Sequence, residues 1–132
     1  MQPLRRKAQF EAVLATPPMV QSGHFAVHGL LGSVGQAPSA LFGSPGPWLG
    51  LVVPRRWARR AVTRNLIKRQ ARAVAAELGL PPGAWVLRLK RGWPTSEFPS
   101  AASAALRRAV RAELLQLLGQ RLPQRLATGG RP

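Results

Sequence analysis

Acidic residues and cysteine are scarce or missing in this chain. The 132-residue sequence has no cysteine and no aspartate, and its four acidic residues are all glutamate. Without cysteine, disulfides and thiolate metal sites are excluded. No apolar run reaches the ~18 residues that a membrane helix needs, and no long apolar segment follows the N-terminal charges as in a secretory signal. We therefore expect a cytoplasmic protein with no membrane contact.

The lack of acids also limits what chemistry the protein can perform. A protein nuclease usually needs clustered carboxylates to hold metal ions, or a histidine pair for acid–base work. The four glutamates are far apart in the sequence, and a Ser–His–Asp triad is excluded without aspartate. His24 and His28 would share one strand face, where hydrogen-bonded or RNA-facing roles are expected. We predict no catalytic residue and no metal ligand in the protein, so any reaction belongs to a partner.

Positive charge is abundant. Twenty Lys+Arg residues against four Asp+Glu give a formal net charge of +16 and a pI near 12.0. Seventeen of the 20 are arginine, which binds phosphate in bidentate fashion and stacks on bases. A GC-rich genome would account for part of this arginine bias. The charge nevertheless points to nucleic acid before a protein partner or a membrane.

The hydrophobic pattern predicts one small α+β domain. Apolar residues make up 45% of the chain, enough for a core. Helical and strand periodicities predict helices at Lys7–Ala15, Arg59–Leu78 and Ser100–Leu118, and strands at His24–Leu31, Trp48–Val53 and Ala84–Lys90. The Gly/Pro-rich segment 33–47 reads as a loop with room for a short strand at 40–42. We expect the domain to span 1–118, followed by a frayed basic tail, 119–132.

The segment Arg55–Arg72 concentrates the charge. It holds eight basic residues and no acid, and four of the basic residues recur at every fourth position from Arg60. Like charges at this spacing weaken an isolated helix, so a polyanion such as RNA is expected to neutralise them. Next to the basic residues runs an apolar stripe that is expected to pack on the sheet. The stripe consists of Ile67, Ala71, Val74, Ala75 and Leu78.

The segment Leu49–Arg72 resembles the protein component of bacterial ribonuclease P. That family has a strand ending in Gly-Leu-x-Val, then two basic residues, then a helix with Arg-Asn-Arg-x-Lys-Arg. The matching pieces here are Gly50–Val53, Arg55-Arg56 and Arg64–Arg69. Weaker similarity extends the match over roughly residues 4 to 118.

The resemblance implies a specific role. The family's protein is an accessory subunit of a ribozyme, and the RNA subunit with Mg²⁺ removes the 5′ leader from precursor tRNA. Mg²⁺ is then held mainly by RNA, the partners are the ribonuclease P RNA and precursor tRNA, and no obligate protein partner is expected. The implied fold is αβββαβα with a four-stranded sheet and a left-handed crossover, which the usual right-handed rule would not suggest.

The resemblance also assigns residues. The surface expected to contact the catalytic RNA consists of Arg55, Arg56, Arg59, Arg60, Arg64, Asn65, Lys68, Arg69 and Arg72. A cleft between the first helix and the sheet is expected to receive the leader, and its residues are Arg6, Phe10, Phe25 and His28. Stacking on an aromatic ring contributes about 1–3 kcal/mol per base. Core packing is the alternative for Phe10 and Phe25.

The chain departs from the family pattern at two informative positions. Leu66 stands where the helix motif has a second arginine, so one RNA contact is expected to be lost or moved. His28 stands where tyrosine is common, which makes the expected leader cleft less aromatic. Two other functions share the basic composition: a structural ribosomal-type RNA-binding protein and a chromosomal DNA-binding protein. The ordered spacing from Gly50 to Arg69 favours the ribonuclease P subunit over both.

Overall fold

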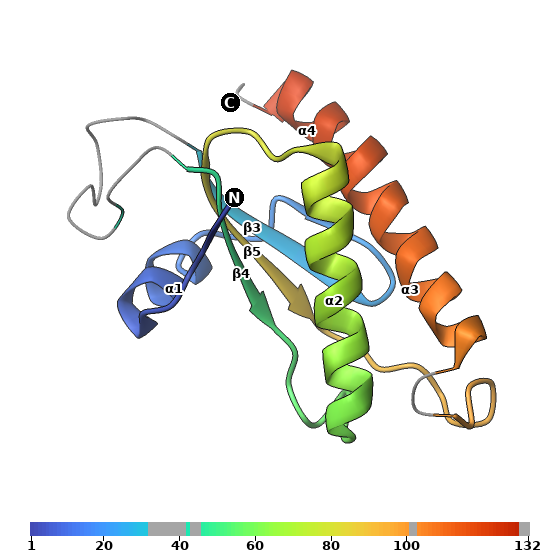
Figure 1. Cartoon of the computed structure of the whole chain (residues 1–132). Coiled ribbons are helices and arrows are strands. Elements are labelled where there is room, and N and C mark those ends of the chain that lie inside the picture. The colour runs from blue at the N-terminus through green and yellow to red at the C-terminus, as the bar shows by residue number, and fades with distance from the viewer. Residues whose placement is uncertain (32–41, 43–45, 101–102, 130–132) are drawn as a thin grey trace.

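The computed structural model describes residues 1–31, 42, 46–100 and 103–129. Five strands and a set of helices form one α+β unit, in agreement with the predicted class (Figure 1). The elements in chain order are β1 (Gln2–Pro3), α1 (Lys7–Leu14), β2 (Val20–Gln21), β3 (Phe25–Leu31), β4 (Trp48–Val52), α2 (Ala61–Leu78), β5 (Gly83–Leu89), α3 (Ala104–Gln116), the π-helical turn η1 (Leu117–Arg121) and α4 (Leu122–Gly129).

The sheet is mixed, with the strand order β1-β4-β5-β3-β2. The central strand β5 runs parallel to β4, with Leu51 opposite Leu87, and antiparallel to β3, with Val27 opposite Leu87. Five strands replace the expected four because β1 and β2, each two residues long, pair along the outer strands. The strand expected at 40–42 falls mainly on residues outside the described part of the chain.

Helix α2 connects the neighbouring parallel strands β4 and β5. In Figure 1 the chain descends β4, rises through α2 in front of the sheet, and descends again in β5 to the right of β4. This path is a left-handed crossover, an exception to the right-handed rule. It agrees with the fold that the family resemblance implied. The segment leaving β4 runs directly into α2, so the two lie together at one end of the sheet.

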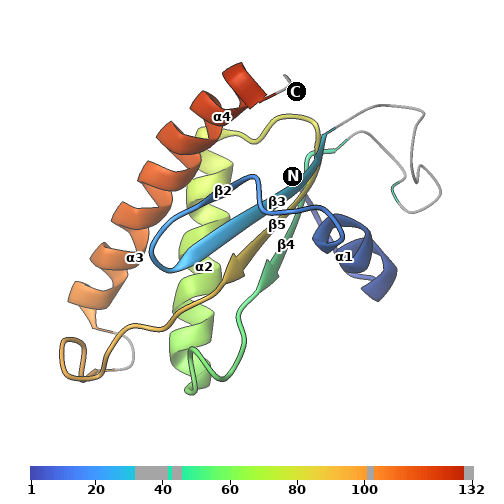
Figure 2. The same ribbon diagram turned by 180° about the vertical axis from the view of Figure 1, so that it is seen from behind.

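Each face of the sheet has its own core. Side chains alternate between the two faces along a strand, so Trp85 and Leu87 of β5 pack under α2 and α3, while Val86 faces α1. All three are buried. Figure 2 shows α1 on the face opposite α2 and α3. The central strand is thereby covered on both sides.

Helix α2 packs its apolar stripe largely as the sequence predicts. Ile67, Ala71, Val74 and Ala75 are buried, and the helix ends at Gly79. Leu78 was also expected in the buried stripe, but it is 43% exposed and lies outside the core. Within the described residues, no helix is both long and apolar enough to cross a membrane.

The C-terminal segment is helical and not frayed. Beyond α3 the chain continues through η1 into α4, and Leu117 and Leu122 are almost fully buried. The Leu122 amide donates to the carbonyl of Leu117, five residues earlier. This wider turn precedes Pro123, which lacks an amide donor and would obstruct an ordinary helical turn. The frayed tail expected at 119–132 is therefore wrong for residues 119–129, which are helical. Residues 130–132 lie outside the described part.

Candidate nucleic-acid interface

The nine predicted RNA-binding residues lie on α2 and the turn before it. Seven of them are exposed, and Arg64 and Lys68 are partly buried. Six of the cations make no hydrogen bond or ion pair with another described residue. We call these six the unpaired cations: Arg55, Arg59, Arg60, Lys68, Arg69 and Arg72. Such a concentration of uncompensated charge is suited to an extended anion.

The turn between β4 and α2 is held firmly in place. The amides of Trp57 and Ala58 both donate to the carbonyl of Pro54, each at 3.1 Å, and Ala58 is buried in the core. A Cβ atom at Gly92 would lie 2.2 Å from the carbonyl oxygen of Trp57, so only glycine allows this close approach. The turn therefore packs against the segment after β5 and presents Arg55 at a fixed position.

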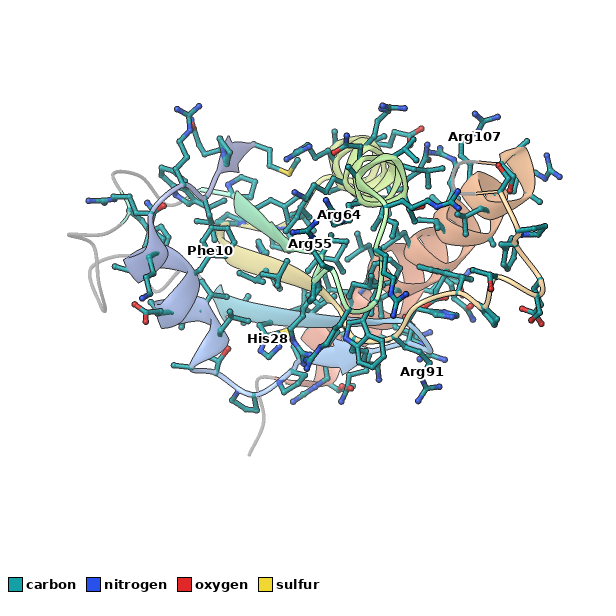
Figure 3. All side chains as sticks on the ribbon, turned by 90° about the horizontal axis from the view of Figure 1, so that it is seen from below. Phe10, His28, Arg55, Arg64, Arg91 and Arg107 are labelled. Carbon is teal, nitrogen blue, oxygen red and sulfur yellow. The ribbon has the colours of Figure 1, made fainter. Side chains whose placement is uncertain are left out.

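Arg64 has a structural role in addition to its charge. Its Nη1 donates to the carbonyls of Ala58 at 3.0 Å and Arg59 at 2.7 Å. These bonds tie the first turns of α2 to the preceding turn, where no side chain caps the helix. Figure 3 looks along α2 from this end and labels Arg64 and Arg55. Sequence reasoning assigned Arg64 to phosphate alone and missed this contact.

Trp57 is a candidate interface residue that the sequence analysis did not identify. The residue is 37% exposed, and the guanidinium of Arg56 lies 5.2 Å from the ring centroid. That distance is typical of a cation–π contact. The turn thus presents a flat aromatic surface among arginines. The signal in the sequence was a tryptophan surrounded by basic residues.

Leu66 faces inward. It is 6% exposed and joins the core cluster under α2 and α3, although the family motif has arginine at this position. The position therefore contributes to packing in this chain.

The expected leader residues separate into two groups. Arg6 is exposed beside α1, and Phe10 of α1 is partly buried against Leu4 and Val13. Phe10 approaches the sheet closely because Gly50 has no side chain: a Cβ atom there would lie 2.5 Å from the ring. Figure 3 shows Phe10 on α1, and the assignment of both residues to leader binding stays a prediction.

The assignment of Phe25 and His28 to the leader cleft is wrong for this structure. Phe25 is 1% exposed and belongs to the core on the α2 and α3 face, so the core-packing alternative holds for it. His28 is 5% exposed; its Nδ1 donates to the carbonyl of Thr16 at 2.8 Å, and Arg88 Nε donates to its Nε2 at 3.4 Å. Both nitrogens of the His28 imidazole are hydrogen-bonded. The rings of Phe25 and His28 are both buried. Neither residue offers a stacking surface.

Two glutamates are occupied by protein partners. The carboxylate of Glu113 accepts from the backbone amide of His24 at 2.8 Å, and it pairs with His24 Nδ1 at 2.6 Å. The His24 ring stacks on Trp93 with centroids 4.0 Å apart. Glu77 pairs with Arg111. Among the described residues, no three metal-ligating side chains come together, so this region is a structural cluster.

Comparison with protein families gives one clear match. The model of the Ribonuclease P family matches residues 1–111. The ribonuclease P protein component of Burkholderia mallei (strain SAVP1) is 32% identical over 117 residues, covering 87% of this chain and 78% of that protein. The one from Ralstonia pickettii (strain 12J) is 35% identical over 116 residues, covering 86% and 74%.

Solved structures with the same fold come from more distant relatives. The RNase P protein of Staphylococcus aureus superimposes with a TM-score of 0.63 at 15% identity, covering 90% of this chain and 94% of that one. The RNase P protein from Thermotoga maritima gives a TM-score of 0.61 at 22% identity, covering 89% and 96%. At these identities the likeness concerns the fold.

Proposed function

Because the chain belongs to the ribonuclease P protein family, we propose that it binds the catalytic RNA of that ribonuclease and the 5′ leader of precursor tRNA. The hydrolysis that releases the leader is then performed by the RNA subunit with Mg²⁺. The protein adds affinity and position, and it contributes no catalytic residue.

The unpaired cations carry this proposal. Arg60, Arg69 and Arg72 are exposed along α2 and have no protein counterion among the described residues. Each is able to neutralise an RNA phosphate and release a condensed counterion. Asn65, exposed between them, supplies an amide that can both donate to and accept from a base or ribose. The firmly held turn extends the same positive track through Arg55 and Arg56.

The α1 face is proposed to contact the leader. Arg6 offers a charge for its phosphates, and the partly buried ring of Phe10 offers an edge beside the sheet. Since Phe25 and His28 are buried, this cleft offers fewer rings than the sequence suggested. Leader binding should therefore rest more on charge than on stacking, and should weaken noticeably as salt rises.

Reconstitution tests the main proposal. The full chain is mixed with a bacterial ribonuclease P RNA and precursor tRNA at low Mg²⁺, and cleavage and RNA affinity are measured. We expect faster cleavage and tighter binding to that RNA than to a ribosomal RNA fragment of similar length. Equal affinity for both RNAs, with no stimulation of cleavage, would favour the ribosomal-type alternative.

A variant pair tests the leader contact. Phe10→Ala should reduce the preference for precursor over mature tRNA, whereas Phe10→Leu keeps apolar packing against Leu4 but removes the ring. If both variants lose the preference while their melting temperatures stay close to wild type, the ring contacts the leader. Loss of folding in Phe10→Ala, together with full preference in Phe10→Leu, would leave Phe10 as a packing residue.

A further inference from the structure

Helices α2 and α3 enclose an open groove that the basic motif alone does not reveal. Its volume is about 400 Å³. Six lining residues come from one strip of α2 and one from the first turns of α3. They are Ala61, Val62, Asn65, Leu66, Arg69, Gln70 and Arg107.

The lining combines three kinds of surface. Ala61, Val62 and Leu66 are apolar, and Val62 is 47% exposed although it is β-branched and hydrophobic. Asn65 and Gln70 add side-chain amides that make no hydrogen bond to another described residue. A planar, partly apolar group with hydrogen-bonding edges fits such a surface better than a bare ion does.

Two arginines complete the groove. Arg69 of α2 and Arg107 of α3 line the same cavity, and no acidic residue lines it. Neither guanidinium has a partner among the described residues. Two like charges facing one space disfavour each other unless an anion lies between them. Figure 3 shows Arg107 on the α3 side, away from Arg55 and Arg64.

We propose that this groove binds one unpaired nucleotide of the partner RNA. The base lies on the apolar floor, the amides of Asn65 and Gln70 contact its edge, and Arg69 and Arg107 hold the adjoining phosphate. A nucleotide supplies the flat face, the polar edge and the negative charge that this lining requires. The proposal rests on the RNA-binding function and extends the interface from α2 to α3.

Charge is tested with two neighbouring arginines. The full chain is titrated with a bacterial ribonuclease P RNA over a series of salt concentrations. Arg107→Ala should raise Kd by about three- to tenfold and lower the salt slope by about 0.7–0.9, as the loss of one phosphate contact predicts. Arg108→Ala makes the same charge change at an exposed position of the same helix but does not line the groove, and should stay within about twofold of wild type.

The apolar floor is tested by filling the groove. Val62→Trp leaves the charge unchanged, so it should raise Kd severalfold at an unaltered salt slope. In base-specific chemical probing, one unpaired nucleotide protected by the wild-type protein should become reactive with this variant. Ala61→Phe, at another exposed position of the lining, provides a second filling variant should Val62→Trp fold poorly; circular dichroism checks both.

Three results would overturn the groove assignment. The first is an equal effect of Arg107→Ala and Arg108→Ala. The second is a filling variant that folds and leaves both affinity and protection unchanged. The third is a loss of affinity confined to Arg107→Ala, which would mean phosphate contact without a bound base. Wild-type protein that fails to bind this RNA at all would overturn the proposed function as well.

Discussion

The cations of α2 and its preceding turn and the three arginines Arg111, Arg121 and Arg125 of the C-terminal helices differ in their partners. On α2 and its preceding turn, six cations have no partner among the described residues. In the C-terminal helices, Arg111 pairs with Glu77, Arg121 donates to the carbonyl of Gln21, and Arg125 donates to that of Met19. Both regions are basic in sequence. We therefore propose that cations whose charge no protein group uses are the ones available to RNA.

The largest expected effect is on RNA affinity. Arg60→Ala with Arg72→Ala removes two unpaired cations, and at about 0.1 M salt each lost phosphate contact weakens binding by about tenfold. Arg121→Ala with Arg125→Ala removes the same charge from the C-terminal helices and should leave affinity within about threefold. Salt-dependent titration of a ribonuclease P RNA measures both. If the two double variants lost RNA affinity equally, unpaired and paired arginines would not differ in their contribution to RNA binding.

The next effect is on stability. Glu113→Ala leaves the amide and ring of His24 without their acceptor, and a hydrogen bond to a charged group contributes about 1.5–3 kcal/mol. We expect the free energy of unfolding to fall by about 2 kcal/mol while RNA affinity stays unchanged or rises. Urea denaturation measures the first quantity and RNA titration the second. A large loss of RNA affinity in a folded Glu113→Ala protein would contradict a purely structural role.

Arg64 combines the two behaviours. It is one of the basic residues of the α2 motif, and its guanidinium also donates to protein carbonyls. Arg64→Ala should lower the unfolding free energy by about 1 kcal/mol through the lost bonds to Ala58 and Arg59, and should also weaken RNA binding. Arg69→Ala, at an unpaired cation, should weaken RNA binding with no loss of stability. Parallel denaturation and binding curves compare the two. An Arg64→Ala protein as stable as Arg69→Ala would show that the turn does not need this contact.

The smallest effect is expected at the surface pair. The side chains of Arg111 and Glu77 are 37% and 54% exposed, and exposed ion pairs usually contribute less than about 1 kcal/mol. Arg111→Ala should change the unfolding free energy by less than about 0.5 kcal/mol and leave RNA affinity close to wild type. A calorimetric melting curve measures the change in stability, and RNA titration measures the affinity. A marked loss of affinity would move Arg111 into the RNA-binding region.

Local patterns predicted much of this fold. Helical spacing predicted the buried stripe of α2 from Ile67 to Ala75, and strand periodicity predicted the bounds of β3, β4 and β5 to within one residue. Both signals lie within a single element, where the chain's own geometry determines which side chains share a face. The left-handed crossover came from family resemblance, because no local pattern encodes handedness.

The errors involve contacts that reach beyond the helix or strand that holds the residue. His28 is buried because Thr16 and Arg88 reach its ring from other elements, and Arg64 turns back to carbonyls that precede α2. Residues 119–129 contain glycine and proline, which ordinarily end helices, but the π-turn and the burial of Leu122 keep this segment helical. Tertiary packing overrides local propensity in such cases.

The contacts from α4 and η1 to β2 have a consequence for behaviour in concentrated solution. An outer strand with open carbonyls is a template on which another chain can add a strand and start aggregation. Here Arg121 and Arg125 occupy the carbonyls of Gln21 and Met19, at and beside this outer strand. A second molecule would have to displace two guanidinium groups and bring its own positive charge against them. These two contacts therefore disfavour the addition of another strand at β2.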